Sequence, residues 1–368
     1  MGTGSGQLVN AAFFVQSGGP LLVEKVSAHP PGPRDVVVRM RAAGICHTDA
    51  TVLAAGALPT PPAILGHEGA GVVEWVGPEV SEFRVGDRVL GLTISRCGRC
   101  ANCRRGTPYL CETAGPYAEP RAVRSDGTEL VTKNGLGTFA ETMTVPPERL
   151  IAVRTDLPDE QLALVGCAIT TGYGAVVNSA AVQPGQTVVV IGCGGVGQAV
   201  VQAARIAGAE RVIAVEPVAA KRELALRLGA TDVIDPTSGQ PLAEAVRALG
   251  VAGADHAFDT VGRTATVRDS YTALRRGGTV VVIGIGDIRT DYALPGTLVV
   301  EAKQVAGCVF GNADVDRDVP RILELAAEGR LDIASMIDKV IDLQSAPAAL
   351  DALHHGDGTG LRTVIAFS

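Results

Sequence analysis

Four cysteines follow one another closely in the first third of this chain, in the pattern C-x2-C-x2-C-x7-C. Thiolates at these spacings can turn back on one metal ion, and four sulfur ligands close a tetrahedral structural zinc site. The main alternative is an iron–sulfur cluster, which commonly has three residues before its last cysteine and a proline after it. This chain has seven residues there, and Glu112 follows the run. The run therefore predicts a zinc-binding lobe over about residues 95–112, with the ligands Cys97, Cys100, Cys103 and Cys111.

A second set of metal-binding side chains lies around that lobe: Cys46, His67 and Cys167. Taken singly, each of them would more often be a core thiol or a hydrogen-bonded core histidine. Each lies within two positions of a glycine, which lets the backbone bend towards a shared centre. Three protein ligands leave the fourth zinc position open for water or substrate. We therefore predict two zinc ions per chain, one structural and one catalytic.

Charge and composition exclude several other classes of protein. The formal net charge is -7, and nucleic-acid binding needs a basic surface, so no nucleic-acid partner is expected. Residues 1–7 lack the features of a secretory signal, and no uninterrupted apolar run of about 18 residues predicts a membrane span. We expect a cytoplasmic protein with no membrane partner. Its eight cysteines are then expected mainly as metal ligands rather than as disulfides.

The pattern of predicted secondary structure changes after Cys167. Before it, short alternating runs bounded by proline and glycine predict a β-rich domain. After it, strand and helix candidates alternate, as in a parallel α/β sheet. The strand candidates are residues 187–191, 211–215, 255–259 and 279–283, the helix candidates are 198–207, 221–228 and 319–328, and a last run covers 361–367. We predict an α/β fold with a cleft between two domains: residues 1–168 with 312–368 are β-rich, and residues 169–311 form a doubly wound parallel sheet.

A glycine-rich turn follows the first of those strand candidates and precedes an alanine-rich helix. A lone G-x-G-x-x-G is weak evidence, but in this context it predicts a turn that binds a dinucleotide pyrophosphate. Glu216, 19 residues after the last glycine, would accept hydrogen bonds from the adenosine ribose and repel a 2′-phosphate. NAD is therefore expected over NADP, although Lys221 and Arg222 weaken that exclusion. The residues of the turn are Gly192, Gly194, Gly195, Val196 and Gly197.

The chain resembles a known family over nearly its whole length, from about residue 10 to the end. Its motif Gly66-His67-Glu68-x-x-Gly71-x5-Gly77-x-x-Val80 is similar to the zinc signature of the medium-chain alcohol dehydrogenases. The segment 44–49, the four-cysteine run and Cys167 follow in the order and spacing of that family. The resemblance implies a GroES-like catalytic domain built from both ends of the chain, with a Rossmann domain between them.

The resemblance also implies roles for single residues. Cys46, His67 and Cys167 match the ligands of the catalytic zinc, Asp49 and Glu68 match residues that hold and tune it, and Thr48 matches the first group of a proton relay. Many relatives complete that relay with a histidine where this chain has Thr51, so His47, solvent or another group must complete it here. The positions that match cofactor contacts, besides the glycine-rich turn, are His47, Thr171, Glu216, Lys221 and Arg362.

The expected activity is reversible hydride transfer between a primary or secondary alcohol and NAD, giving an aldehyde or ketone. Thr93 stands at a position that is often aromatic in relatives, so the alcohol is expected to be bulkier than ethanol. The fairly long segment between Cys111 and Phe139 favours a homodimer over a tetramer.

Three alternatives remain open at this point. The segment 46–49 also resembles thiol-dependent formaldehyde dehydrogenases, but the arginine expected near Gly115 for glutathione is missing. A nicotinoprotein alcohol dehydrogenase, which never releases its NAD, is a second alternative. A non-catalytic zinc- and NAD-binding redox sensor is a third, and retention of the open-site ligands with Thr48 and Glu68 argues against it.

Overall fold

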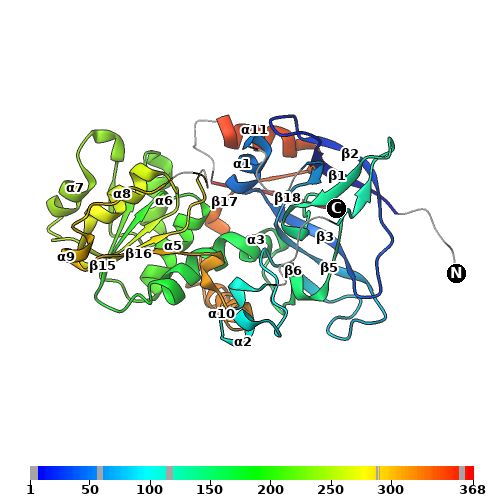
Figure 1. Cartoon of the computed structure of the whole chain (residues 1–368), viewed down its shortest axis with the longest axis horizontal. Coiled ribbons are helices and arrows are strands. Elements are labelled where there is room, and N and C mark those ends of the chain that lie inside the picture. The colour runs from blue at the N-terminus through cyan, green and yellow to red at the C-terminus, as the bar shows by residue number, and fades with distance from the viewer. Residues whose placement is uncertain (1–6, 56–60, 113–118, 287–288, 290, 356–360) are drawn as a thin grey trace. The chain divides into compact units, whose positions relative to one another are not determined.

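The computed structural model describes residues 7–55, 61–112, 119–286, 289, 291–355 and 361–368 (Figure 1). The chain divides into two compact units. The first consists of Met1–Cys167, Asp314–Pro320 and Ile337–Ser368, and the second of Ala168–Ala313 and Arg321–Met336. The chain thus leaves the first unit after Cys167, returns for Asp314–Pro320, enters the second unit again for Arg321–Met336 and ends in the first. All of residues 312–368 were predicted to belong to the first domain, whereas Arg321–Met336 clusters with the second unit.

Five short strands of the first unit close into a barrel. Side chains of a strand alternate between its two faces. On the first strand, Val9, Ala11 and Phe13 therefore pack in one buried cluster, while Ala12 and Phe14 pack in another. The order around the barrel is β1 (Leu8–Phe14), β2 (Leu22–Ala28), β7 (Ala122–Val123), β8 (Glu129–Thr132) and β4 (Ala63–Ile64).

A seven-stranded sheet forms a second layer of the first unit. Its order is β10 (Leu150–Ala152), β6 (Arg88–Gly91), β5 (Glu68–Val76), β3 (Val36–Gly44), β18 (Arg362–Ala366) and β17 (Ile337–Ile341), and β9 (Thr142–Val145) also pairs with β3. The C-terminal strand β18 runs antiparallel to β3, so the end of the chain completes a sheet that its beginning started. In the antiparallel pair β3 and β5, Gly44 lies opposite Glu68. Residues that follow β3 and residues that precede β5 therefore meet at one end of the sheet.

The helices of the first unit are short. Helix α1 packs against α11 through buried side chains that include Ala50, Val52 and Leu350. The helical segments are α1 (His47–Ala55), α2 (Ala101–Arg104), α3 (Asp159–Leu164) and α11 (Ala346–His355), with single turns η1 (Pro108–Leu110), η2 (Lys133–Gly135), η3 (Pro147–Arg149) and η9 (Leu343–Ser345).

The second unit contains a six-stranded parallel sheet. Its order is β13 (Asp232–Ile234), β12 (Arg211–Val215), β11 (Thr187–Ile191), β14 (Ala254–Asp259), β15 (Leu274–Val282) and β16 (Gln304–Gly307). In chain order this is 3-2-1-4-5-6, the arrangement of the Rossmann fold. Every neighbouring pair is parallel. Parallel sheets are covered on both faces, which is why Val188, Val189 and Val190 form an unbroken buried run.

The connections of the second unit are mostly helical. They are α4 (Thr170–Gly174), η5 (Ala175–Ser179), α5 (Gly195–Ile206), α6 (Ala219–Leu228), η6 (Pro236–Ser238), α7 (Leu242–Ala248), α8 (Thr264–Ala273), α9 (Leu298–Glu301), η7 (Phe310–Asn312), α10 (Val315–Ala327) and η8 (Ala334–Met336). The first residues of α10 belong to the first unit and its later residues to the second.

The predicted elements are confirmed, with shifted ends. The strands at 187–191 and 211–215 have the predicted bounds, and α6 ends at Gly229, whose φ of 119° is left-handed. The helix predicted over 319–328 begins four residues earlier, at Val315, and contains Pro320. Its start is stabilised by Asp318, whose carboxylate accepts a hydrogen bond from the Asp314 N–H. That local hydrogen bond was not visible in the apolar pattern.

The chain passes from one unit to the other inside a continuous helical stretch, Asp159–Ser179. This stretch is long and apolar enough to cross a membrane, but 78% of its most apolar window is buried inside the protein, as in the core helix of a globular fold. It contains two π-helical turns, η4 (Val165–Ile169) and η5. Such turns insert one extra residue per turn and are frequent at functional sites.

We predict that Gly174→Ala destabilises the second unit by about 1–3 kcal/mol, because overpacking outweighs the better helix propensity of alanine. A Cβ on Gly174 would lie 2.9 Å from the Cα of Gly311. Denaturant unfolding followed by far-UV circular dichroism measures the effect. Gly296→Ala is the control, since a Cβ there meets nothing within 4 Å. Equal unfolding midpoints for the two variants would contradict the prediction.

Candidate functional site

The structure brings together the predicted open metal site of the first unit. The donor atoms of Cys46, His67, Glu68 and Cys167 all lie within 4.8 Å of one another. A zinc ion with bonds of about 2.0–2.3 Å to sulfur and nitrogen needs donors at about this mutual separation. His67 is 2% exposed and Cys46 is 8% exposed, so these two donors are shielded from bulk water, whereas Cys167 is partly exposed. Two sulfurs and one imidazole suit zinc, and the Glu68 carboxylate stands beside them.

Strand pairing explains why Cys46 and His67 meet. Cys46 follows β3 by two residues, His67 immediately precedes β5, and the register sets Gly44 opposite Glu68. A Cβ at Gly44 would collide with the Glu68 carboxylate and lie 2.9 Å from Leu164 Cδ2. Glycine at this position therefore allows the Glu68 carboxylate to lie against β3.

Cys167 reaches the same centre through the π-helical turn η4. The extra residue in such a turn re-aims the side chains within it. Its neighbour Gly166 packs tightly, because a Cβ there would lie 2.9 Å from the Gly91 carbonyl oxygen. The sequence indicated the cysteine and the glycine, but nothing in it indicated the π turn.

The Asp49 carboxylate contacts groups on both Cys46 and His67. Its carboxylate accepts from the Cys46 N–H (3.2 Å) and the Gly66 N–H (3.2 Å), and it lies 3.1 Å from His67 Nδ1. The side chain is fully buried. A carboxylate on Nδ1 holds the imidazole so that Nε2 faces the metal. Burial lowers the pKa of His67, but Asp49 and the Cys46 thiol outweigh it and raise the pKa to about 10.

Glu68 is held by Arg362. The guanidinium bonds to Glu68 Oε1 and donates to the Ile45 carbonyl oxygen at 3.1 Å. Burial raises the pKa of Glu68 to about 7, against the opposing effect of Arg362. Within the described residues, Glu68 Oε2 and Arg362 Nε have no hydrogen-bond partner. The sequence predicted Arg362 as a cofactor contact; the structure places its guanidinium on Glu68, and the cofactor role stays a prediction.

The two thiols of the centre have opposite pKa shifts. A hydrogen bond from Cys167 and the nearby His67 lower the pKa of Cys46, whereas the same bond and burial raise the pKa of Cys167. Both thiols must lose their protons to bind a metal ion, so metal binding at this centre releases protons.

The residues predicted to form a proton relay lie at the start of α1. His47 is exposed, and Thr48 Oγ1 lies 3.6 Å from Cys46 Sγ. Thr51, at the position of the missing histidine, donates its hydroxyl to the His47 carbonyl oxygen at 3.1 Å. Thr93 donates its hydroxyl to the His67 carbonyl oxygen, also at 3.1 Å. The small Thr93 side chain is thereby held against the ligand segment.

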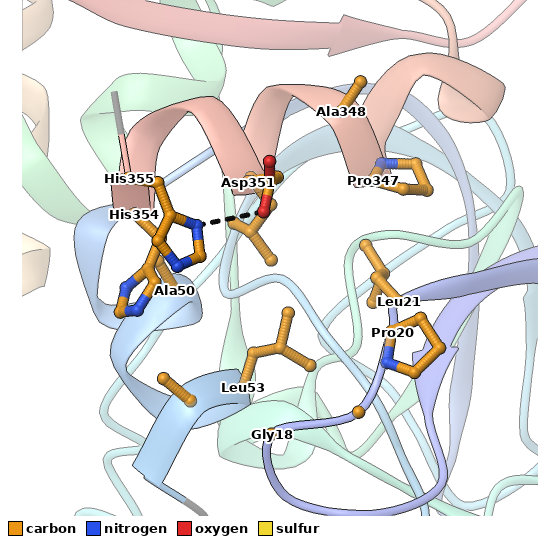
Figure 2. Close-up of a pocket in the computed structure, with 13 residues that line it drawn as sticks. Gly18, Pro20, Leu21, Ala50, Leu53, Pro347, Ala348, Asp351, His354 and His355 are labelled. Atoms are coloured by element: carbon orange, nitrogen blue, oxygen red, sulfur yellow. Dashed lines mark hydrogen bonds and ion pairs between the residues drawn. The ribbon is translucent and has the colours of Figure 1, made fainter. Parts of the chain in front are cut away.

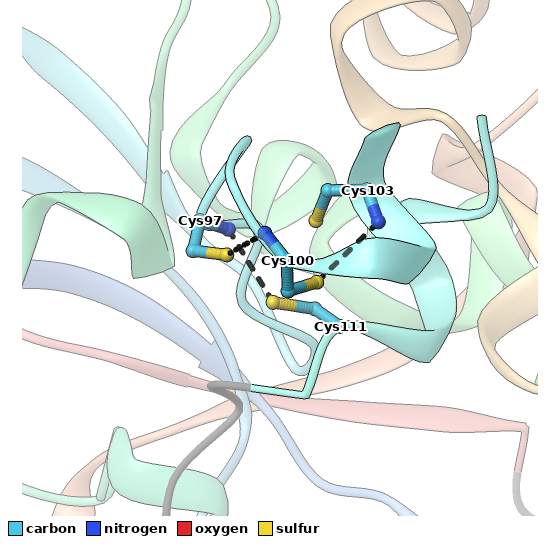
Figure 3. A group of neighbouring side chains, drawn as sticks. All are labelled: Cys97, Cys100, Cys103 and Cys111. Atoms are coloured by element: carbon cyan, nitrogen blue, oxygen red, sulfur yellow. Dashed lines mark hydrogen bonds between the residues drawn. The ribbon is translucent and has the colours of Figure 1, made fainter. Parts of the chain in front are cut away.

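The four-cysteine lobe is also assembled (Figure 3). Its four sulfurs lie within 4.8 Å of one another, and Cys100 caps α2. Backbone N–H groups of the lobe point at sulfurs: Cys97 N–H to Cys111 Sγ (3.4 Å), Cys100 N–H to Cys97 Sγ (3.3 Å) and Cys103 N–H to Cys100 Sγ (3.4 Å). These bonds stabilise thiolates, so the lobe fits a closed zinc site.

In the second unit, the glycine-rich turn has the shape that a pyrophosphate needs. Gly192 has a φ of 83°, and a Cβ on Gly197 would collide with the Gly192 carbonyl oxygen. A Cβ on Gly194 would meet nothing within 4 Å, so the backbone at the start of α5 is open to a ligand. The N-terminus of a helix attracts phosphate. This geometry fits a dinucleotide.

Glu216 directly follows β12 and lies beside that turn. Its carboxylate accepts from the Cys193 N–H at 2.7 Å and from the Val218 N–H at 3.0 Å. Arg222 donates to the Glu216 and Pro217 carbonyl oxygens and pairs with Asp235 at 3.0 Å. The arginine that the sequence analysis counted against NAD is therefore engaged with a carboxylate. Thr171 is buried in α4 and Lys221 is half-buried in α6.

Two residues near these sites gave no signal in the sequence. Gln198 bridges the turn and α6, donating its amide to the Cys193 and Lys221 carbonyl oxygens. Lys133 follows Thr132, which pairs with Ile64 in β4, and it is only 4% exposed. A glutamine in an amphipathic helix and a lysine in a turn both look like surface residues until the chain is folded.

The first unit also has a cavity of about 560 Å³ away from the metal ligands (Figure 2). It lies between the β1–β2 connection, α1 and α11, with the His355 ring 3.0 Å from an Asp351 oxygen at one end. None of its lining residues was predicted as a site residue.

We predict that Cys111→Ser halves the zinc content, leaving one ion per chain, because a serine oxygen is a poor replacement for a thiolate at a closed tetrahedral site. Metal analysis of the purified protein measures it. Cys193→Ser, in the glycine-rich turn, serves as the control and should keep both ions. Two zinc ions retained in Cys111→Ser would show that the lobe does not bind metal through this sulfur.

Comparison with known proteins places these sites in a family. Residues 32–155 match the model of the alcohol dehydrogenase GroES-like domain, and residues 195–328 match that of the zinc-binding dehydrogenases. An S-(hydroxymethyl)glutathione dehydrogenase of Synechocystis sp. is 35% identical, covering 96% of this chain and 98% of its own. An alcohol dehydrogenase class-3 of Cereibacter sphaeroides is also 35% identical, over 97% of this chain and 99% of its own.

Solved structures agree with this assignment. An alcohol dehydrogenase zinc-binding domain protein from Burkholderia ambifaria has a TM-score of 0.91 at 32% identity, covering 98% of this chain and 99% of its own. The benzyl alcohol dehydrogenase of Acinetobacter calcoaceticus has a TM-score of 0.89 at 28% identity, covering 98% of this chain and all of its own. The chain belongs to the zinc-dependent medium-chain alcohol dehydrogenase family, an oxidoreductase family whose cofactors are zinc and NAD(P).

Proposed function

We propose that this chain oxidises a primary or secondary alcohol bulkier than ethanol to its aldehyde or ketone with NAD, and that it catalyses the reverse reaction. The observation that carries the proposal is the set of Cys46, His67 and Cys167, whose donor atoms lie within 4.8 Å of one another, while the neighbouring Glu68 carboxylate is bonded to Arg362. Such a set leaves one position for a substrate oxygen.

The residues of the site have separate tasks in this proposal. Cys46, His67 and Cys167 hold the zinc, and Asp49 fixes the imidazole. Zinc supplies Lewis acidity that favours loss of the hydroxyl proton, and NAD accepts the hydride. The Thr48 hydroxyl takes the proton that leaves the substrate. The exposed His47 on the same helix, or solvent, receives it next, since the Thr51 hydroxyl already donates to the His47 carbonyl oxygen.

Cofactor choice follows from the end of β12. Glu216 provides a negative charge where the adenosine ribose of a dinucleotide would lie, which disfavours a 2′-phosphate. Arg222 is paired with Asp235, so it offers less positive charge to such a phosphate. Gly194 leaves room for the pyrophosphate. These three features support NAD over NADP.

The size of the alcohol is inferred from Thr93. A threonine held against the His67 carbonyl oxygen occupies less space than an aromatic ring would. The relative from Acinetobacter calcoaceticus that oxidises benzyl alcohol agrees with a bulky substrate. A thiol-dependent oxidation of formaldehyde is the second candidate, because several relatives carry the name S-(hydroxymethyl)glutathione dehydrogenase. Glutathione was considered unfavourable because the arginine expected near Gly115 is missing. That position lies outside the described residues.

We also propose a cytoplasmic homodimer. In the described part of the second unit, β16 ends the sheet and pairs on one side only. Val299 and Val300 beside it are 79% and 77% exposed. An edge strand with exposed apolar neighbours suits pairing with the same strand of a second copy.

A substrate panel tests the proposed function. We expect NADH formation with benzyl, terpenoid and longer aliphatic alcohols at a higher kcat/KM than with ethanol, and little reaction with NADP. Absorbance at the NADH band measures oxidation, and the same band measures reduction of the matching aldehydes. Formaldehyde is assayed with and without glutathione. A higher kcat/KM for ethanol contradicts the pocket-size argument, and a strict requirement for the thiol favours the second candidate.

We predict that Thr48→Ala lowers kcat by about 10²–10⁴-fold and changes the pH–rate profile, because the first proton acceptor is lost. Thr51→Ala is the matched control three residues along the same helix, and it should keep the parent profile. Steady-state kinetics across pH measure both variants. A Thr48→Ala profile that matches the parent would refute the relay.

A further inference from the structure

One buried glutamine joins the glycine-rich turn to helix α6. Gln198 lies near the start of α5 and is only 1% exposed. Its side-chain nitrogen donates to the Cys193 carbonyl oxygen at 3.1 Å and to the Lys221 carbonyl oxygen at 3.0 Å. Cys193 belongs to the turn, and Lys221 lies in the first turn of α6. Because both partners are carbonyl oxygens, only the amide nitrogen can face them, and this fixes the orientation of the side chain.

Packing alone does not account for a glutamine at this position. The Gln198 Oε1 atom is buried and has no hydrogen-bond partner within the described residues. A buried acceptor without a partner is unfavourable, and an apolar side chain of similar length would avoid that cost. The two hydrogen bonds that the amide nitrogen donates are therefore the distinctive contribution of Gln198.

Gln198 and Glu216 complete a closed ring of hydrogen bonds in the second unit. The Glu216 carboxylate accepts from the Cys193 N–H at 2.7 Å and from the Val218 N–H at 3.0 Å. The Val218 carbonyl oxygen accepts from the Lys221 N–H at 3.1 Å. Gln198 then leads from Lys221 back to Cys193. Cys193 is thus held through its N–H by Glu216 and through its carbonyl oxygen by Gln198.

The ring contains two residues that were predicted to contact the cofactor, Glu216 and Lys221. Each Glu216 carboxylate oxygen accepts one backbone N–H and keeps a further lone pair that can accept from a ribose hydroxyl. The carboxylate is therefore fixed in place and is still able to bind. Groups that are held in their binding geometry before the ligand arrives lose less freedom on binding, which raises affinity.

We propose that Gln198 is a positioning residue of the dinucleotide site, which holds the glycine-rich turn and the first turn of α6 so that Glu216 and Lys221 can bind the same adenosine ribose. The proposal rests on the NAD site proposed above and adds a residue to it. Gln198 acts through its neighbours, because its amide nitrogen is already used by two protein carbonyl oxygens. Its contribution therefore belongs to the affinity for the adenosine half of the cofactor and not to the chemical step.

Gln202 offers a matched control one turn further along the same helix. It is fully buried, its side-chain nitrogen donates to the Asp332 carbonyl oxygen at 3.0 Å, and its oxygen accepts from the Asp332 N–H at 2.7 Å. Asp332 also belongs to the second unit, but it lies in neither the glycine-rich turn nor α6. Methionine has nearly the length and shape of glutamine but no donor. Replacing each glutamine by methionine therefore separates positioning of the nucleotide site from stabilisation of α5.

The experiment uses the full-length protein and measures binding without turnover. Calorimetric titration with ADP-ribose measures binding of the adenosine and pyrophosphate half alone, and NADH fluorescence measures binding of the whole dinucleotide. We expect dissociation constants on the order of tenfold higher for both ligands in Gln198→Met and Gln198→Leu, because two hydrogen bonds are lost. The kcat at saturating NAD, with the best alcohol of the panel above, should stay close to the parent. Gln202→Met should bind both ligands as the parent does, even where denaturant unfolding shows a similar loss of stability.

Each other outcome overturns the proposal. ADP-ribose affinity equal to the parent in both Gln198 variants does so directly. Equal weakening in Gln202→Met does so as well, since any loss of hydrogen bonds in α5 would then have the same effect. Failure of both Gln198 variants to fold where Gln202→Met folds assigns Gln198 a structural role instead. Absence of ADP-ribose and NADH binding in the parent refutes the dinucleotide site itself and the proposal with it, whereas the preceding outcomes leave that site intact.

Discussion

The pairing of β3 with β5 is the constraint on which the site depends. Its register sets Gly44 opposite Glu68, so the residue that ends one strand meets the first residue of the other. Cys46 and His67 lie just beyond that pair, and β18 adds Arg362 from the far end of the chain to the same sheet. A slip of one residue would turn every side chain to the opposite face. The absence of a Cβ at Gly44 lets the Glu68 carboxylate occupy this place.

Burial of several charges together is the second feature of the centre. Taking a lone charge out of water is costly, so buried charges are paired or bind metals. Asp49 and Glu68 are fully buried, and Arg362 is 6% exposed. At this centre Arg362 is bonded to Glu68, and a zinc ion at the proposed site would offset the charge of the two thiolates and of Asp49.

Much of the fold was predictable because its signals are local. The run 187–191 into the glycine-rich turn predicted β11 and α5, and Gly229 marked the end of α6. The grouping of the two sets of candidate metal ligands was also predictable, because cysteine spacing and the motif at 66–68 indicate it, and the structure brings each set together. The start of α10 at Val315 was missed because it depends on a hydrogen bond between Asp314 and Asp318 rather than on an apolar pattern.

The sequence by itself determined which side chains are candidate metal donors, the alternation that builds the parallel sheet, and the family. Only the tertiary structure decided that Arg362 bonds to Glu68, that a π turn carries Cys167, and that Lys133 is buried. The physical reason is the distance along the chain over which each effect acts. Spacing and propensity act over a few residues, whereas the field around a buried charge depends on groups that lie far apart in the chain and meet only when the sheets close.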